Sequence, residues 1–258
     1  MPGSGFSQTN QTSADLTPSD TDAVAVSIVV PVRNEAENVA PLIAEIVGAL
    51  DGRWVYEIIY VNDGSTDATA GRLADLMKQH RQLRQLKHAH SSGQSAAVRS
   101  GVRAARGAIV ATLDGDGQNN PVFLPDLIAA VENGGGRVGL VAGQRVGRKD
   151  TGFKKLQSRI ANGVRKTILN DGTRDTGCGL KAFRRETLLP TVERCVIDRD
   201  LFSSELVIRA GREGVRVIEI PIRLDEKRPP AINLVKRVPN VLRGMAKLTY
   251  VIRFGGKP

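Results

Sequence analysis

The sequence predicts an α/β protein with a single, mostly parallel β-sheet flanked by helices. Between residues 24 and 143, short apolar runs alternate with amphipathic segments, which is the pattern of successive βαβ units. Three of the apolar runs end in acidic or amide residues, and parallel sheets bind ligands at the carboxyl ends of their strands. With 258 residues, 41% of them hydrophobic, the chain can bury one large core.

The first half of the chain is expected to alternate regularly between strands and helices. In order, the expected elements are strand 24–32, helix 36–50, strand 55–62, helix 66–79, strand 83–88, helix 93–105, strand 108–113, helix 121–133 and strand 138–143. Ser65 or Thr66 is a candidate N-cap of the second helix. The glycine triplet at 134–136 should end the fourth helix.

The second half of the chain is less regular. Its expected elements are helix 153–169, loop 170–181, helices near 185–193 and 202–213, strand 215–222 and a final helical region over 235–254. The expected organisation is a disordered polar tail (1–22), one folded domain (23–230, with halves of about 23–145 and 146–230) and a basic amphipathic segment (231–258).

The net charge of +10 is concentrated in two stretches. Residues 227–258 carry eight Lys or Arg and no acid, and residues 153–169 carry five and no acid. Both stretches are amphipathic, so they fit either an anionic membrane surface or a core-facing stripe with a solvated basic back. Aromatic content of 4% and the lack of a nucleic-acid module argue against nucleic-acid binding.

The expected location is the cytoplasm, with peripheral attachment to the cytoplasmic face of the membrane. The chain has two cysteines and no signal peptide, which favours a reducing compartment. No apolar run approaches the roughly 18 residues of a membrane-spanning helix. Cys178 is expected to be a packed thiol, and His80, His88 and His90 are expected to have surface or structural roles.

One strand continues directly into the sequence Leu-Asp-Gly-Asp-Gly-Gln. Asp114 and Asp116 are separated by one residue across a glycine turn, so both carboxylates can face one divalent cation. Together with the amide of Gln118 they are hard oxygen ligands that suit Mg²⁺ or Mn²⁺ bridging to a diphosphate. A calcium EF-hand is excluded because Asn119 and Pro125 stand where that loop needs Gly and Glu. An ordinary turn without metal is the alternative.

Two further strand ends supply polar groups to the same edge. The strand that ends near Val61 is followed by Asp63, whose carboxylate can accept hydrogen bonds from a nucleobase edge. The first strand ends in Pro31-Val-Arg33-Asn-Glu35, although Glu35 also fits an ordinary first-turn helix acid. Three polar strand ends favour one shared site over three unrelated turns.

The sequence Gly-Gln-Ser at 93–95 precedes a predicted helix, and two interpretations stay open. Its backbone N–H groups can face a phosphate, or it can be a simple helix start. Neither GxGxxG at the first helix nor GxxxxGK[ST] is present, so dinucleotide and P-loop sites are not favoured.

Together, these motifs resemble those of family 2 glycosyltransferases, which have the GT-A fold. In the first half the matching motifs are Pro31-Val-Arg-Asn-Glu35, Val61-Asn-Asp63-Gly-Ser and Asp114-Gly-Asp116-Gly-Gln118. In the second half they are Ser158-Arg159-Ile-Ala161-Asn162, Asp175-Thr-Gly-Cys-Gly-Leu-Lys181-Ala-Phe-Arg-Arg185 and Phe202-Ser-Ser-Glu205-Leu. These are similar to dolichol-phosphate mannose synthases and their bacterial polyprenyl-phosphate relatives. The similarity covers roughly residues 24–240.

The resemblance implies an inverting, metal-dependent hexosyltransferase that moves a sugar from a nucleotide-sugar to a polyprenyl phosphate. The implied nucleotide-sugar ligands are Pro31, Arg33, Glu35, Val61, Asp63, Asp114, Gly115, Asp116, Arg145 and Arg228. The implied metal ligands are Asp114, Asp116 and Gln118, for Mg²⁺ or Mn²⁺. Arg159 and Lys181 would bind the acceptor, and Asp116, Asp175 and Arg145 would act in catalysis. Further implied partners are the membrane surface and a separate membrane protein or a second copy of the chain.

Four positions depart from the family pattern and leave the sugar and the base open. Arg33 replaces a base-stacking Tyr, Asn62 replaces the first acid of a pair, and Gly179 replaces a Ser near the acceptor phosphate. The Ser-Lys that follows the late arginine is missing, with Asn233 and Lys236 nearby.

Other functions also stay open. A saccharide hydroxyl acceptor would require a general base, for which Asp175 or Glu205 is the candidate. A nucleotidyltransferase would require a Gly-rich amino-terminal loop with Lys and Arg, which is absent. A non-enzymatic nucleotide-binding protein would tolerate the loss of Asp116.

Overall fold

The computed structural model describes residues 23–146, 175–197, 202–224 and 250. No helix within these ranges has the length and apolarity needed to cross a bilayer. Several predictions lie outside the described residues: the tail at 1–22, the helix at 153–169, the segment at 231–258, and the roles of Arg159, Arg228 and Lys236.

The core of the fold is a seven-stranded sheet in the order β3-β2-β1-β4-β6-β5-β7. Its strands are β1 (Val26–Val32), β2 (Tyr56–Asn62), β3 (Leu83–Lys87), β4 (Ile109–Thr112), β5 (Val138–Arg145), β6 (Lys181–Arg184) and β7 (Arg216–Ile222). All neighbours are parallel except β6, which runs antiparallel to both β4 and β5. The predicted mostly parallel α/β fold is confirmed.

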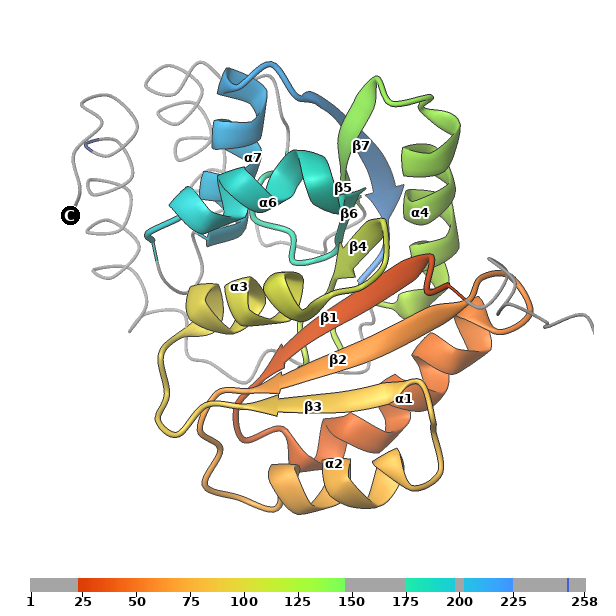
Figure 1. Ribbon diagram of the computed structural model, residues 1–258, viewed down its shortest axis with the longest axis vertical. Helices are drawn as coiled ribbons and strands as arrows, with labels where there is room; N and C mark the ends of the chain where they lie inside the picture. The colour runs from red at the N-terminus through yellow and green to blue at the C-terminus, as the bar shows by residue number, and fades with distance from the viewer. Residues whose placement is uncertain (1–22, 147–174, 198–201, 225–249, 251–258) are drawn as a thin grey trace, which may run out of the picture.

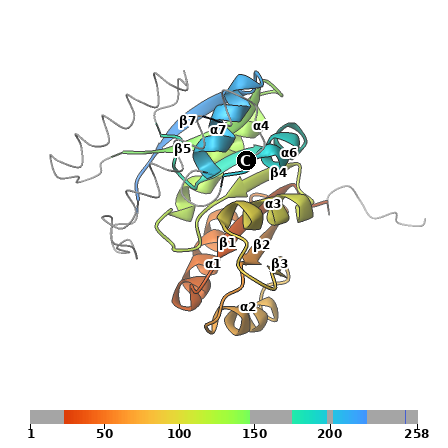
Figure 2. The same ribbon diagram turned by 90° about the vertical axis from the view of Figure 1, so that its left-hand side faces the viewer.

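Helices cover both faces of the sheet (Figures 1 and 2). One face packs against α1 (Ala36–Leu50), α2 (Thr69–Met77) and α4 (Leu124–Asn133), and the other against α3 (Gln94–Ala104), α6 (Arg185–Arg194) and α7 (Phe202–Arg212). A short 3₁₀ turn, η2 (Pro121–Phe123), precedes α4. Successive residues of β1 alternate between the two cores, as the period of a strand requires.

The second helix begins later than predicted. It starts at Thr69, whose backbone N–H donates to Asp67 Oδ1 at 3.0 Å. Ser65 and Thr66 contact the preceding loop instead: the Asn34 backbone N–H donates to Ser65 Oγ at 3.0 Å, and Asn34 Oδ1 accepts from the Thr66 N–H at 2.8 Å. Asn34 has a positive φ of 57°, which asparagine tolerates better than most residues. The predicted caps therefore join the loops after β1 and β2.

The sequence analysis missed β6. The residues Lys-Ala-Phe-Arg were placed at the junction of a loop and a helix, and a four-residue strand is too short to show a period of its own. In the sheet, Lys181 pairs with Thr112 of β4 on one side and with Ala142 of β5 on the other. The missed strand therefore brings a lysine between the two strands that end in the candidate site residues.

A buried carboxylate, that of Glu57, stabilises the amino ends of the strands, opposite the predicted site at their carboxyl ends. Glu57 is 1% exposed, accepts hydrogen bonds from Ser27 Oγ at 2.7 Å and the Arg106 N–H at 2.8 Å, and forms an ion pair with Arg84 at 2.8 Å. Glu57→Ala should therefore lower the free energy of unfolding by about 3 kcal/mol, because several donors lose a charged partner. Urea denaturation at neutral pH measures this difference.

The same group predicts a pH dependence. Burial alone would raise the pKa of Glu57, but hydrogen bonds from Arg106 and Ser27 and the charge of Arg84 lower it below 4.5. A carboxylate with a lowered folded-state pKa stabilises the fold above its unfolded pKa and loses this contribution as the pH falls. The stability difference between wild type and Glu57→Ala should shrink below about pH 4. A difference that stays constant down to pH 3 would contradict this assignment.

Candidate functional site

The loops after β1 and β4 meet at the carboxyl edge of the sheet, as predicted. Glu35 follows β1, and burial raises its pKa, with a hydrogen bond from Asn38 opposing the shift. The negative charges of Asp116 and Asp67 raise the pKa of Glu35 further. Glu35 and Asp116 therefore repel each other across this edge, although they are far apart in the sequence.

Asp114 is fixed by an amide on each carboxylate oxygen. Gln94 Nε2 donates to Oδ1 at 2.8 Å, and Asn119 Nδ2 donates to Oδ2 at 3.0 Å. Burial and the charge of Asp116 raise the pKa of Asp114, while Lys181 and Asn119 act in the opposite direction. The first acid of the pair is thus enclosed by protein groups.

Asp116 is less enclosed. One of its oxygens accepts the backbone N–H of Gln118 at 3.0 Å, which closes a tight turn. Within the part of the chain that the structure describes, the other oxygen accepts no hydrogen bond, and no three His, Cys, Asp or Glu side chains are arranged to hold a metal. Mg²⁺ commonly binds one or two carboxylates together with substrate phosphates. Two mutually repelling carboxylates beside an amide fit such a cation.

Two glycines allow the acid pair to lie against neighbouring strands. A Cβ at Gly115 would lie 2.8 Å from the Pro31 carbonyl oxygen and 2.3 Å from Cγ1 of Val32. A Cβ at Gly179 would lie 2.1 Å from Asp114 Oδ2, which no real contact permits. The absence of a side chain at 179, a departure from the family pattern, is therefore required by the position of Asp114.

If the chain has the sugar-transfer activity that the family resemblance implies, we expect Gly179→Ala to lower its kcat/KM by about 10- to 100-fold, because the methyl group displaces a carboxylate of the candidate metal site. Steady-state kinetics and thermal denaturation measure the effect. Gly48→Ala in α1 is the matched control, because a Cβ there meets no atom within 4 Å. Unchanged kinetics in Gly179→Ala would show that the position of Asp114 is not critical.

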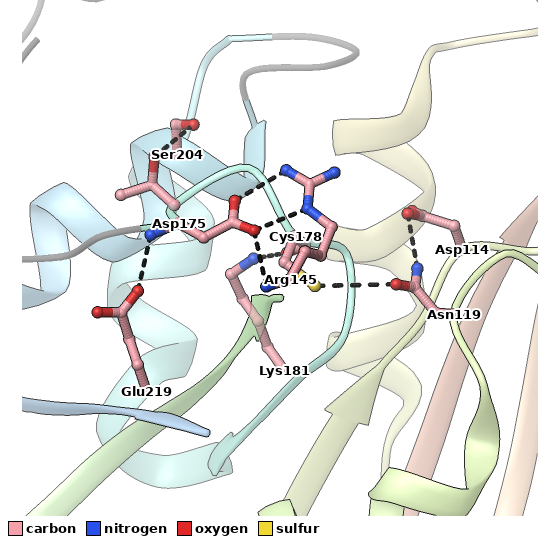
Figure 3. Close-up of polar contacts among 9 residues, drawn as sticks. Asp114, Asn119, Arg145, Asp175, Cys178, Lys181, Ser204 and Glu219 are labelled. Carbon is pink, nitrogen blue, oxygen red and sulfur yellow. Dashed lines mark hydrogen bonds and ion pairs between the residues drawn. The ribbon is translucent and has the colours of Figure 1, made fainter. Parts of the chain in front are cut away.

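Arg145 and Asp175 form a bidentate ion pair (Figure 3). Arg145 Nε donates to Asp175 Oδ2 at 2.7 Å and Nη2 donates to Oδ1 at 2.8 Å. The Arg145 backbone N–H also donates to Oδ2, at 3.1 Å, and the Asp175 N–H donates to Glu219 at 2.7 Å. Burial alone would raise the pKa of Asp175, but Arg145 lowers it below its ordinary value. This pair joins the end of β5 to the loop before β6.

Lys181 lies beneath the site and is 1% exposed. Its ammonium donates to the Cys178 carbonyl oxygen. Burial lowers the pKa of Lys181, while the charges of Asp114 and Asp175 oppose this change. Figure 3 shows the lysine close to the Arg145–Asp175 pair, with Asp114 farther away. Its predicted contact with an acceptor phosphate stays a prediction.

Asp63 lies at the same edge, but its carboxylate is already bound by the protein. It accepts hydrogen bonds from the backbone N–H groups of Ser92 at 2.8 Å and Gly93 at 2.9 Å. Ser91 Oγ donates at 2.8 Å, and His88 Nδ1 lies 2.8 Å away. A carboxylate has about four acceptor positions, so those of Asp63 are occupied. Its predicted contact with a nucleobase stays a prediction.

These contacts bear on the segment at 93–95, which begins α3 at Gln94. The N–H groups of Ser92 and Gly93, just before the helix, face the carboxylate of Asp63. A phosphate contact of the N–H groups of Gln94 and Ser95 stays a prediction. His88 also contacts Ser100 Oγ at 2.9 Å, so its expected structural role is confirmed.

Sequence reasoning missed the contacts made by Gln94 and Glu205. Glu205 is fully buried, accepts the N–H groups of Val196 at 3.0 Å and Ile197 at 2.8 Å, and binds Arg209 at 2.8 Å. Glu205 therefore joins α7 to the residues that follow α6. Such contacts join segments that are separate in the sequence, so hydrophobic periodicity does not reveal them.

The remaining predicted residues lie near this edge with different exposures. Pro31, the second-last residue of β1, is half-buried and pairs in register with buried Val61 of β2. Arg33 is exposed in the following loop. Cys178 is fully buried, its thiol 3.8 Å from Asn119 Oδ1, as expected of a packed thiol.

The structure is that of an α/β protein with paired carboxylates after β4 and a mostly buried ion pair at the end of β5. Residues 27–189 match the family model described as Glycosyl transferase family 2, and the chain belongs to this family.

Curated relatives are about a third identical to the chain over the aligned region. A dodecaprenyl-phosphate galacturonate synthase from Rhizobium johnstonii is 36% identical over 63% of this chain and 48% of its own length. An undecaprenyl-phosphate 4-deoxy-4-formamido-L-arabinose transferase from Edwardsiella ictaluri is 32% identical over 78% of this chain and 60% of its own length. The chain therefore spans about half to three-fifths of the length of these relatives.

Solved structures share the GT-A fold. Glucosyl-3-phosphoglycerate synthase from Mycobacterium tuberculosis aligns over 91% of this chain and 82% of its own, with a TM-score of 0.67 and 19% identity. The same enzyme in complex with Mn²⁺ and uridine-diphosphate-glucose aligns over 88% and 79%, with a TM-score of 0.65 and 20% identity. At this identity the likeness establishes the fold alone.

Proposed function

We propose that the chain is an inverting glycosyltransferase that moves a sugar from a nucleotide-sugar to a polyprenyl phosphate, with Mg²⁺ or Mn²⁺ as cofactor. The choice of a phosphate acceptor rests on one observation: the carboxylates of both candidate general bases are already bound by protein groups. Asp175 is bound by Arg145, and Glu205 is buried with three donors. A hydroxyl acceptor needs such a base, whereas a phosphate monoester is already ionised at neutral pH because its second pKa is about 6.

The donor side of the proposed site is formed by the loops after β1, β2 and β4. Pro31, Arg33, Glu35 and Val61 contribute to the nucleoside pocket, and Asp63 contributes by holding the neighbouring loop. The cation ligands would be Asp114, Asp116 and Gln118, with Gly115 giving the turn its close approach to β1. When bound, Mg²⁺ or Mn²⁺ supplies positive charge that stabilises the departing nucleoside diphosphate.

The acceptor side of the proposed site is basic. Arg145 adds fixed positive charge at the end of β5 and would stabilise charge on the leaving group. Lys181, with Arg159 from outside the described residues, would bind the acceptor phosphate and offset its repulsion by the donor phosphates. Arg228, also outside the described residues, would bind the donor diphosphate. In-line attack by the acceptor oxygen inverts the anomeric centre. The name of each relative above includes a polyprenyl phosphate, which supports this acceptor.

The proposal also includes the kind of sugar that is transferred and the location of the protein in the cell. We propose a hexose as the sugar, although one relative is named for galacturonate and the other for a substituted arabinose, so the donor must be tested broadly. A lipid acceptor places the chain peripherally at the cytoplasmic membrane face. The basic segments at 153–169 and 231–258 would supply that contact, beside a separate membrane protein or a second copy of the chain.

A donor panel tests the acceptor class. We expect one of several radiolabelled UDP- and GDP-sugars, incubated with undecaprenyl phosphate and Mn²⁺, to give label that extracts into organic solvent. The same donors with oligosaccharide acceptors serve as the comparison. Label that appears only in water-soluble saccharide would contradict the lipid-phosphate acceptor and favour a saccharide hydroxyl.

A further inference from the structure

The first acid of the pair is held by a residue from another layer of the fold. Gln94 is the first residue of α3, and its amide lies 2.8 Å from Asp114 Oδ1 at the end of β4. Gln94 and Asp114 line the same small cavity, together with Lys181, Gly179 and Phe202. The amide therefore reaches into the site that the proposed function uses.

The backbone around Gln94 is fixed on both sides. Before it, the N–H groups of Ser92 and Gly93 bind the two oxygens of Asp63. After it, the Ser95 hydroxyl donates to the Ile197 carbonyl oxygen. Gly93 has a φ of 91°, a left-handed conformation that glycine adopts readily. These contacts fix the backbone at the first turn of α3, from which the Gln94 side chain extends. The hydrogen bond to Asp114 then holds the amide itself.

The opposite oxygen of Asp114 is held in the same way. Asn119 donates to it at 3.0 Å, and Gly179 closes off the space beside the carboxylate. A carboxylate with an amide on each oxygen cannot rotate without breaking a hydrogen bond. The orientation of the Asp114 carboxylate is therefore fixed by protein groups.

We propose that Gln94 is a positioning residue that fixes the Asp114 carboxylate for cation and diphosphate binding. This inference rests on the proposed function, because it concerns the same metal site. Hydrogen-bonding partners of metal ligands typically contribute 10- to 100-fold to metal affinity or activity. Gln94 would act through Asp114 alone and would not contact the substrate.

The test is direct Mn²⁺ binding to the full chain in the presence of UDP, with free Mn²⁺ measured by electron paramagnetic resonance. Gln94→Met removes the amide at similar volume and should weaken Mn²⁺ binding by about 10- to 100-fold. Gln94→Asn keeps an amide but shortens its reach, so it should also weaken Mn²⁺ binding. This variant provides the test if Gln94→Met folds poorly. Gln79→Met, at an exposed glutamine beyond the end of α2, is the matched control and should bind as wild type does.

A second measurement separates positioning from a general structural role. In an Asp114→Asn background, Gln94→Met should cause no further loss of Mn²⁺ affinity, because the group it positions is already changed. Equal losses in both backgrounds, or wild-type Mn²⁺ affinity in Gln94→Met and Gln94→Asn, would overturn the inference and leave the metal site intact. Absence of Mn²⁺ binding by the wild-type chain would instead contradict the metal site of the proposed function.

Discussion

Asp116→Asn is expected to lower kcat/KM for sugar transfer by about 10³-fold or more, which corresponds to about 4 kcal/mol of transition-state stabilisation. Among the described residues, one oxygen of Asp116 accepts no hydrogen bond, whereas both oxygens of the neighbouring Asp114 are bound by amides. The amide keeps the shape of the side chain but removes the negative charge that would hold a cation. Initial-rate kinetics over a range of Mn²⁺ concentrations measure the loss.

This substitution should not destabilise the fold. Asp116 repels Asp114 and Glu35, so Asp116→Asn should leave the thermal midpoint unchanged or raise it. Asp75→Asn, at an exposed acid of α2, is the control and should keep full activity. Retained transfer activity in Asp116→Asn would contradict the metal assignment.

Arg145→Met should have the second large effect, on both stability and activity. The substitution leaves the Asp175 carboxylate without its two guanidinium contacts. Removing one partner of a mostly buried ion pair commonly costs about 3–5 kcal/mol. Because Arg145 is 24% exposed and Asp175 17% exposed, we expect a loss of about 3 kcal/mol in urea denaturation, together with at least a 10²-fold loss in kcat/KM.

The matched control is Arg103→Met. Arg103 pairs with Glu193, but its side chain is 62% exposed, and exposed ion pairs contribute about 0–1 kcal/mol. Arg145→Met should therefore destabilise the fold by at least twice as much as Arg103→Met. Equal effects of the two substitutions would show that the Arg145–Asp175 pair does not hold β5 to the following loop.

Sequence patterns predicted the first half of the fold because its strands and helices are long enough to show their period. The run from β1 to β5 follows the expected order, with boundary shifts of a few residues. The short strand β6 has no such signal, and its antiparallel pairing depends on contacts with β4 and β5. The position of Lys181 between Thr112 and Ala142 therefore became visible only in the folded sheet.

The roles of the site residues stay predictions. The strand-end motifs indicated that polar groups gather at one edge of the sheet, and the charges of Glu35 and Asp116 interact there. The motifs did not indicate that Asp63 binds the loop before α3, or that Gln94 binds Asp114. These hydrogen bonds depend on where separate segments meet in space, which residue spacing along a single chain does not encode.

The account depends most on metal-dependent transfer to a lipid phosphate. The most direct measurement is transfer of label from the accepted nucleotide-sugar to undecaprenyl phosphate by the wild-type chain, with Mn²⁺, with EDTA, and with EDTA followed by excess Mn²⁺. We predict label in the organic phase with Mn²⁺, its loss with EDTA and its recovery when Mn²⁺ is restored. Equal transfer to the lipid in the presence of EDTA would contradict the account.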